Sequence, residues 1–286
     1  MAAINREMYP IIDDFKQLEF HDSVSGITLK YNLFIPTGHD STKAYPLVLF
    51  MHDLGVISDD PLTTLTQGIG GVVWATPAEQ AKHESFVLAP QYARQIVNDQ
   101  SEATEELEVT VRLVQYLVSL YSIDANRLYT TGQSMGCMMS IEMMVRYPDL
   151  FAAALLVAGQ WDAQRMSALM DAALWIVVSE GDEKAFPGMN DSMAALEAKG
   201  AAVSRATWNG RAAPEEFARE VRTMVAEESR IKYTVLRKGT VVPNGIPETG
   251  YSNHQHTWPI AYQIDGLRDW LFSQRRQARS YGGKGV

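Results

Sequence analysis

A serine between two glycines, where a strand gives way to a helix, constrains this chain more than any other feature of its sequence. Residues 131–136 read TGQSMG, after the apolar run RLYT and before the helix-forming run CMMSIEMMVRYP. Glycines at 132 and 136 allow a strand and the following helix to approach too closely for side chains, which leaves Ser134 on a strained bend. Free N–H groups and the helix dipole favour negative charge there. The pattern predicts a serine nucleophile, and a tight turn without catalytic function is the alternative.

The segments around this motif alternate between two kinds. Amphipathic stretches such as residues 101–121 separate short apolar runs, which are PLVLFMH, SFVLAPQY, RLYTTG, AALLVAGQ and LWIVVSEGD. Alternation of buried strands with helices predicts an α/β protein whose mostly parallel sheet has helices on both faces. Before it, two alternating runs on either side of residues 24–26 predict an antiparallel hairpin. Together these features predict an α/β-hydrolase fold.

We expect a single domain over residues 1–286, because no repeat, low-complexity segment or long linker divides the chain. One strand-helix-strand unit would be enough to reach the histidines from Asp182. Residues 209–250 add a further helix and a further strand, which indicates an insertion. If the insertion lies beyond the carboxyl ends of the strands, it forms one wall of the pocket through Trp208 and Tyr251. The alternative is that it only extends the edge of the sheet.

Composition excludes several classes of function. The formal net charge is −9 and no basic run occurs, which argues against a nucleic-acid partner. The one cysteine, Cys137, excludes an intrachain disulfide and a cysteine-based metal cluster. No apolar run reaches the roughly 18 residues that span a bilayer. The first residues lack the features of a signal peptide, which predicts a cytoplasmic protein, or a secreted one if a leader was removed.

An acid and a base are required after the serine. On this fold the order along the chain is serine, acid, histidine. Asp182 follows the buried run LWIVV, where open α/β sheets place their sites, and Glu183 is the alternative. Both carboxylates could instead cap the next helix. The base is expected in YSNHQHTWPIAY, read as a polar loop, which offers His254 and His256.

An oxyanion hole needs two backbone N–H groups. Met135, the residue after the serine, is expected to supply one. Leu54, in the loop after PLVLFMH, is expected to supply the other. His52 in that loop is interpreted as a residue that organises the loop and not as a catalyst.

Taken together, these elements resemble the α/β-hydrolase serine esterases related to polyhydroxybutyrate depolymerases and prolyl-oligopeptidase-type peptidases. The resemblance runs from about residue 18 to 274 through YNLFIP, PLVLFMHDLG, FVLAPQY, DANRLYTTGQSMG, VSEGD and HQHTWPIAYQIDGLRDWLFSQ. It implies a triad of Ser134, Asp182 and His254, no cofactor, and esters of fairly small acids as substrates. His254 is preferred as base because the histidine in similar sequences stands a few residues before a tryptophan, here Trp258. One departure is Asp53, which stands where similar sequences have glycine.

The sequence therefore predicts a serine carboxylesterase that hydrolyses esters of small or aromatic carboxylic acids through an acyl-enzyme. Its partner is a small-molecule ester, held by Trp208, Tyr251 and Trp258, and no metal is expected. Triad residues alone do not distinguish this from a serine peptidase of prolyl-oligopeptidase type. A catalytically silent hydrolase-fold binding protein is the third reading.

Overall fold

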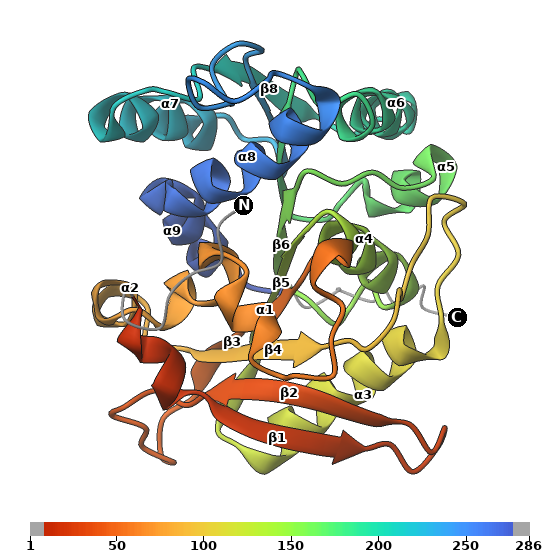
Figure 1. Ribbon diagram of the computed structural model, residues 1–286, viewed down its shortest axis with the longest axis vertical. Coiled ribbons are helices and arrows are strands. Elements are labelled where there is room, and N and C mark those ends of the chain that lie inside the picture. Colours follow the sequence, from red (N-terminus) through yellow and green to blue (C-terminus); the bar gives the residue numbers. More distant parts are fainter. Residues whose placement is uncertain (1–8, 277–286) are drawn as a thin grey trace, which may run out of the picture.

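A mixed sheet of nine strands runs through the computed structural model, which describes residues 9–276 (Figure 1). The strands are β1 (Lys16–His21), β2 (Thr28–Phe34), β3 (Tyr45–Met51), β4 (Phe86–Gln91), β5 (Ile123–Gln133), β6 (Ala153–Val157), β7 (Leu174–Ser179), β8 (Val203–Trp208) and β9 (Ile231–Leu236). Their order across the sheet is β1-β2-β4-β3-β5-β6-β7-β9-β8. β2 pairs antiparallel with both neighbours, and the remaining pairs are parallel. The predicted α/β-hydrolase fold, with its N-terminal hairpin, is confirmed.

Helices cover both faces of this sheet. The α-helices are α1 (Thr63–Thr66), α2 (Pro77–Lys82), α3 (Glu105–Leu120), α4 (Met135–Arg146), α5 (Ala163–Met166), α6 (Ala185–Ala198), α7 (Pro214–Ala226), α8 (Gly250–Gln263) and α9 (Asp265–Ser273). Short 3₁₀ turns are η1 (Pro10–Asp14), η2 (Leu54–Val56), η3 (Ile69–Gly71), η4 (Val73–Ala75) and η5 (Ser167–Leu169). Figure 1 shows α4, α5 and α6 on one side of the sheet, with α7 and α9 on the other.

The pleat of the central strand β3 explains why two separate cores form. Successive side chains of a strand point to opposite faces. Leu47, Leu49 and Met51 accordingly belong to the cluster beneath α3, α4 and α6, whereas Val48 and Phe50 belong to the cluster beneath α7, α8 and α9. All seven residues of β3 are buried, as expected for a parallel strand covered on both faces.

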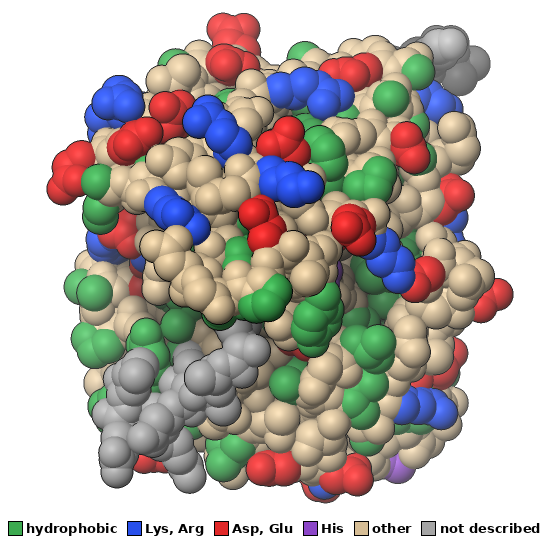
Figure 2. Space-filling model, turned by 45° about the horizontal axis from the view of Figure 1, so that its top comes forward, with side chains coloured by type: hydrophobic (Ala, Val, Ile, Leu, Met, Phe, Trp, Pro, Cys, Tyr) green, Lys and Arg blue, Asp and Glu red, His purple; other side chains and the backbone are tan. Residues whose placement is uncertain are grey.

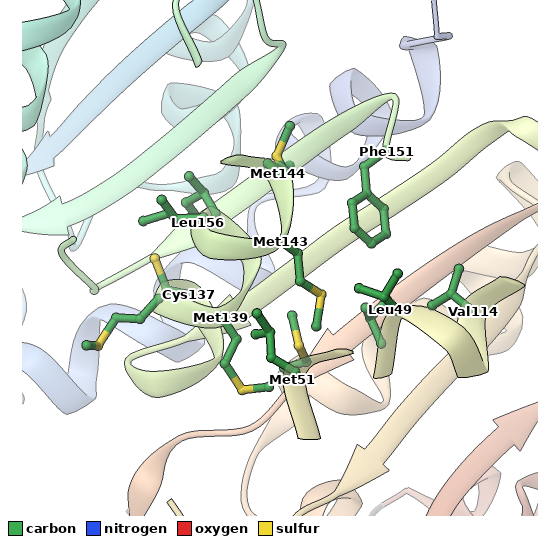
Figure 3. Packing of buried hydrophobic residues seen from close by; sticks show 14 of the residues in the cluster. Leu49, Met51, Val114, Cys137, Met139, Met143, Met144, Phe151 and Leu156 are labelled. Atoms are coloured by element: carbon green, nitrogen blue, oxygen red, sulfur yellow. The ribbon is translucent and has the colours of Figure 1, made fainter. Parts of the chain in front are cut away.

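The methionines of α4 belong mainly to the first core. Figure 3 shows Met139, Met143 and Met144 beside Phe151 and Leu156. Flexible thioethers fill irregular gaps between a helix and a sheet. Cys137 lies in the same cluster, and burial raises the pKa of its thiol. The cysteine therefore behaves as a small buried hydrophobe.

Two crossover connections join the last three parallel strands, β7, β8 and β9, at one end of the sheet. The chain leaves β7 through α6, forms the outermost strand β8, and returns through α7 to place β9 between β7 and β8. Right-handed crossovers in opposite directions require helices on opposite faces, and α6 and α7 indeed belong to different cores. The strand within residues 209–250 is thus an interior strand. The segment has the two parts that the alternative names, an added strand, β9, and a covering helix, α7, although β8 and not β9 forms the edge of the sheet.

Charged side chains of both signs are interspersed on the face shown in Figure 2. The part of this face that the structure describes carries no continuous basic track. Among residues 9–276, no helix has the length and apolar character that a membrane crossing requires.

Candidate functional site

Ser134 occupies the bend between β5 and α4 in a strained conformation. Its φ of 53° and ψ of −117° lie where residues other than glycine seldom occur. The flanking glycines are required by close approach of the backbone. A Cβ on Gly132 would lie 2.4 Å from the carbonyl carbon of Gly136, and one on Gly136 would lie 1.9 Å from the Met51 oxygen. Space for the bend thus exists only because both positions lack side chains.

A chain of two hydrogen bonds connects the serine to a histidine and a carboxylate. His254 Nε2 lies 2.9 Å from Ser134 Oγ, and His254 Nδ1 lies 2.6 Å from Asp182 Oδ2. Because the carboxylate oxygen accepts the Nδ1 proton, Nε2 is left free to accept a proton from the serine. The structure therefore brings the three predicted triad residues together in the order that nucleophilic catalysis uses.

Asp182 is held in place by two further hydrogen bonds. Its side chain is 2% exposed, and Oδ1 accepts the backbone N–H groups of Lys184 at 3.0 Å and Ala185 at 2.9 Å. One oxygen of the carboxylate thus binds backbone N–H groups at the start of α6, where Lys184 is the N-cap residue, and the other oxygen binds His254. Glu183 is exposed and its carboxylate packs beside Gly250 instead.

His254 lies in the second turn of helix α8 and not in a loop, which corrects the sequence interpretation. A capping box between Thr249 and Ser252 starts the helix. The Asn253 side chain then accepts a hydrogen bond from Ser179 Oγ at 3.0 Å and packs against Gly181, where a Cβ would lie 2.4 Å from it. These contacts fasten α8 to the loop that carries Asp182.

His256 belongs to a different face of α8. Two residues along an α-helix correspond to a rotation of roughly 200°, so His254 and His256 cannot both face Ser134. His256 does not line the pocket around the serine, and burial lowers its pKa. Trp258, one turn after His254, meets the imidazole edge to face with ring centroids 5.3 Å apart.

The two predicted oxyanion donors both lie beside the serine in the same pocket. Met135 is the first residue of α4 and Leu54 is the first residue of η2. N–H groups in the first turn of a helix have no partner within the helix and are free to bind a ligand. His52 organises the preceding loop as expected, because its Nδ1 donates to the Asp53 carbonyl at 2.7 Å and its Nε2 accepts the Tyr92 N–H at 3.0 Å.

A pocket of about 500 Å³ surrounds these groups. It is lined by Asp53, Leu54, Gly55, Gln95, Val97, Asn98, Asp99, Ser134, Met135, Met138, Gln160, Asp182, Glu183, Lys184, Gly250, Tyr251, His254, Gln255 and Trp258. Tyr251 and Trp258 thus lie where the sequence predicted substrate contacts. Within residues 209–250, which the structure describes throughout, Gly250 alone reaches this lining, so the insertion does not form the predicted wall.

Trp208 does not belong to this pocket, which corrects a second prediction. It is 2% exposed and packs between Trp175 and Phe217, with ring centroids 6.2 Å away in each case. Its position at the end of edge strand β8, beneath α7, explains its burial. Trp208 is therefore a core residue of the second cluster.

One wall of the pocket was not anticipated from sequence. It comes from the loop after β4, through Gln95, Val97, Asn98 and Asp99. Asp99 is ion-paired with Lys184 and accepts a hydrogen bond from Gln160 Nε2 at 3.1 Å. Polar residues in the segments that follow the carboxyl ends of β4 and β6 are the sequence signal that could have indicated these positions.

Among the described residues, one group of side chains has ligand atoms close enough to share a metal ion: Glu79, His83 and Asp269, within 4.8 Å of one another. These groups already bind other residues or each other. His83 Nε2 lies 2.7 Å from Asp269 Oδ1, and Glu79 Oε2 accepts from Arg268 Nε at 2.8 Å. The cluster is separate from the pocket, and it is accounted for as an ion-pair network between α2 and α9.

Comparison with known proteins gives matches of three kinds. Residues 92–197 match the model of the prolyl oligopeptidase family. The chain is 45% identical over 47 residues to acetylxylan esterase A of Emericella nidulans, which is 16% of either chain. It is 26% identical over 140 residues to feruloyl esterase B of Talaromyces stipitatus, which is 46% of this chain and 36% of that protein. The matched part is thus well under two thirds of these relatives' own length.

Solved structures extend the likeness over most of the chain. A thermostable esterase covers 93% of this chain with 64% of its own, at 26% identity and a TM-score of 0.77. The feruloyl esterase module from Clostridium thermocellum covers 88% of each chain at 16% identity and a TM-score of 0.54, which shows a shared fold. The chain thus has an α/β-hydrolase fold, matches the prolyl oligopeptidase family model over residues 92–197, and is similar to esterases in sequence and structure.

Proposed function

We propose that this protein is a serine carboxylesterase that hydrolyses esters of small or aromatic carboxylic acids through an acyl-enzyme on Ser134. The observation that carries the proposal is the hydrogen-bonded chain from Ser134 Oγ through His254 to Asp182, which starts at a strained bend. Strain of this kind persists only where the surrounding structure enforces it, and it concentrates at functional sites. A catalytically silent protein has no need to keep all of these features together.

In the proposed reaction, Ser134 Oγ attacks the ester carbonyl carbon while its proton moves to His254 Nε2. The oxyanion that forms accepts hydrogen bonds from the N–H groups of Met135 and Leu54. When the tetrahedral intermediate collapses, the alcohol leaves with the proton from Nε2, and the acyl group remains on Ser134. Water then attacks the acyl-enzyme by the same route. Asp182 keeps the imidazole in the required tautomer throughout.

The pocket supports a small or aromatic acyl group. Apolar side chains, namely Leu54, Val97, Met135, Met138, Tyr251 and Trp258, form much of its lining. A volume of about 500 Å³ lies in the range of small-molecule sites and leaves room for one aromatic ring with its ester. The names of the relatives, acetylxylan esterase and feruloyl esterase, support the same range of acids.

A panel of chromogenic acetyl, butyryl, benzoyl and cinnamoyl esters tests this proposal. We expect turnover of at least the short and aromatic members by the wild type, and loss of about 10³-fold or more in the Ser134→Ala variant. The melting temperature of the variant serves as a control for folding. Absence of turnover on every ester, or equal turnover by the variant, would contradict the proposal.

A serine peptidase is the second candidate, since the family match over residues 92–197 includes both Ser134 and Asp182. Peptide hydrolysis uses the same triad, but an amine leaving group needs full protonation before it departs. Peptide anilides measured beside the esters separate the two candidates. A kcat/KM for anilides that exceeds the value for acyl-matched esters would favour the peptidase.

A further inference from the structure

Asp53 is a buried carboxylate directly before the proposed oxyanion donor Leu54. Its exposure is 6%, and its side chain lines the pocket. Each of its oxygens has a partner: Oδ1 accepts the Gly55 N–H at 2.8 Å, and Oδ2 accepts from Gln133 Nε2 at 3.0 Å. The first bond closes the turn η2 around Leu54. The second reaches the residue that precedes the nucleophile.

These two bonds join the oxyanion loop to the nucleophile bend. Gln133 is 2% exposed and ends β5, immediately before Ser134. Gly55 also depends on this arrangement, because a Cβ there would lie 2.9 Å from Asp53 Oδ1. Buried hydrogen-bonded groups of this kind hold one conformation, since breaking either bond leaves a charged oxygen without a partner. The Asp53 side chain thus connects the turn that contains Leu54 with the residue that precedes Ser134.

We propose that Asp53 is a positioning residue, which fixes the Leu54 N–H relative to Ser134 for stabilisation of the oxyanion. This inference rests on the proposed esterase function. It also gives a role to the side chain that stands where the resemblance predicts a glycine, because the carboxylate binds both Gly55 and Gln133. Asp53 acts through Leu54 and touches no substrate atom in this role.

The Asp53→Asn variant separates the effect of the hydrogen bonds of Asp53 from the effect of its negative charge. A carboxylate near a developing oxyanion opposes the negative charge, whereas an amide of the same shape does not. The Asp53→Asn variant keeps an oxygen for the Gly55 N–H. Its new amide nitrogen can donate to Gln133, whose side-chain amide turns over to present its oxygen. The hydrogen bonds, and not the charge, are thus what positioning requires.

The test measures kcat and KM on a chromogenic acetyl ester for three variants beside the wild type. For Asp53→Ala we expect kcat to fall by about 10²- to 10³-fold, the typical loss when one oxyanion donor is removed, with KM changed by less than about threefold. For Asp53→Asn we expect kcat to stay within about tenfold. For Gln133→Glu we expect a loss of at least about tenfold, because two carboxylates would face each other at hydrogen-bond distance.

Combining Gln133→Glu with Asp53→Asn provides a rescue, since the new amide can donate to the new carboxylate. If the double variant recovers at least half of the activation free energy that Gln133→Glu loses, the positioning role is supported. This comparison does not require Asp53→Ala to fold. Asp22→Asn is a matched control: Asp22 is 2% exposed and ion-paired with Arg112, so its loss lowers stability and leaves kcat unchanged.

The outcomes separate this inference from the proposed function. Wild-type turnover that depends on Ser134, together with an unchanged kcat in Asp53→Ala, would overturn the positioning role alone. A folded Gln133→Glu variant whose loss is not rescued by Asp53→Asn would also overturn it. Absence of Ser134-dependent turnover in the wild type would overturn the esterase function itself.

Discussion

His254 Nε2 lies 2.9 Å from Ser134 Oγ, although the two residues are 120 positions apart in the sequence. The contact depends on two elements that are anchored independently: the bend after β5 and the first turns of α8. Asn253, next to the histidine, fastens α8 to Ser179 at the end of β7. Asp182 follows that same strand, so one anchor sets the position of both the base and the acid.

The position of the base predicts that the two histidines of α8 differ in their effect. His254→Ala should lower kcat by at least about 10³-fold, because only this imidazole is within hydrogen-bond reach of Ser134. His256→Ala should retain kcat within about threefold. Steady-state kinetics on the acetyl ester provide the comparison. A larger loss in His256→Ala than in His254→Ala would place the base at residue 256.

The position of the acid leads to a similar pair of variants. Asp182→Asn should reduce kcat by about 10⁴-fold, since an amide can donate to Nδ1 and then favours the wrong tautomer of His254. Glu183→Gln should change kcat by less than about threefold, because Glu183 is exposed and does not contact the imidazole. Rate measurements at pH 8 compare the two variants under one condition. Equal losses would contradict the assignment of Asp182.

Substrate ranking separates Tyr251 from Trp208. Tyr251 is 70% exposed at the pocket, so Tyr251→Ala should change the ratio of kcat/KM between cinnamoyl and acetyl esters by several-fold, with little change in melting temperature. Trp208→Ala should leave that ratio unchanged and destabilise the protein by roughly 3 to 5 kcal/mol, as removal of a buried tryptophan does. An altered ranking in Trp208→Ala would contradict its place in the core.

Buried His52 predicts a loss of stability in mild acid. Burial lowers its pKa in the folded protein, and the neutral ring is needed because Nε2 accepts the Tyr92 N–H. The unfolded chain therefore binds the proton more readily, so this contribution to stability is complete above about pH 6.5 and declines as the pH falls below it. The melting temperature between pH 8 and 5 measures the effect.

In His52→Asn the pH dependence of the melting temperature should be weaker, although the variant is less stable at pH 8. His256→Asn is measured in parallel, because burial lowers the pKa of His256 as well. A slope between pH 6.5 and 5 that is unchanged in His52→Asn would show that another group causes the decline.

The fold was largely predictable from local patterns. Alternating apolar runs and amphipathic stretches indicate buried strands and helices. The glycines on either side of Ser134 predict a close approach of the backbone, which the structure contains. The place of β9 between β7 and β8 was not predictable, because strand order depends on which face each crossover helix covers. That in turn depends on packing between distant segments.

The site was predictable where chemistry fixes the residue type and not where packing does. Ser134 and Asp182 follow from chain order and from their places after strands, with Glu183 as the alternative, whereas His254 was preferred over His256 only through the resemblance to known esterases. The helical state of residues 250–263 did not, since Pro259 within it favours a break and the anchoring of Asn253 on Ser179 is a long-range contact. Trp208 was misplaced because the end of a strand can face either the pocket or the core.

Mass spectrometry of the intact protein after treatment with a fluorophosphonate identifies the nucleophile. We expect one covalent adduct per chain, located at Ser134 by peptide mapping, with loss of ester turnover in proportion to labelling. The Ser134→Ala variant should take up no label at the same exposure. Labelling at another residue, or full ester turnover by a fully labelled protein, would contradict the assignment of Ser134 as the nucleophile.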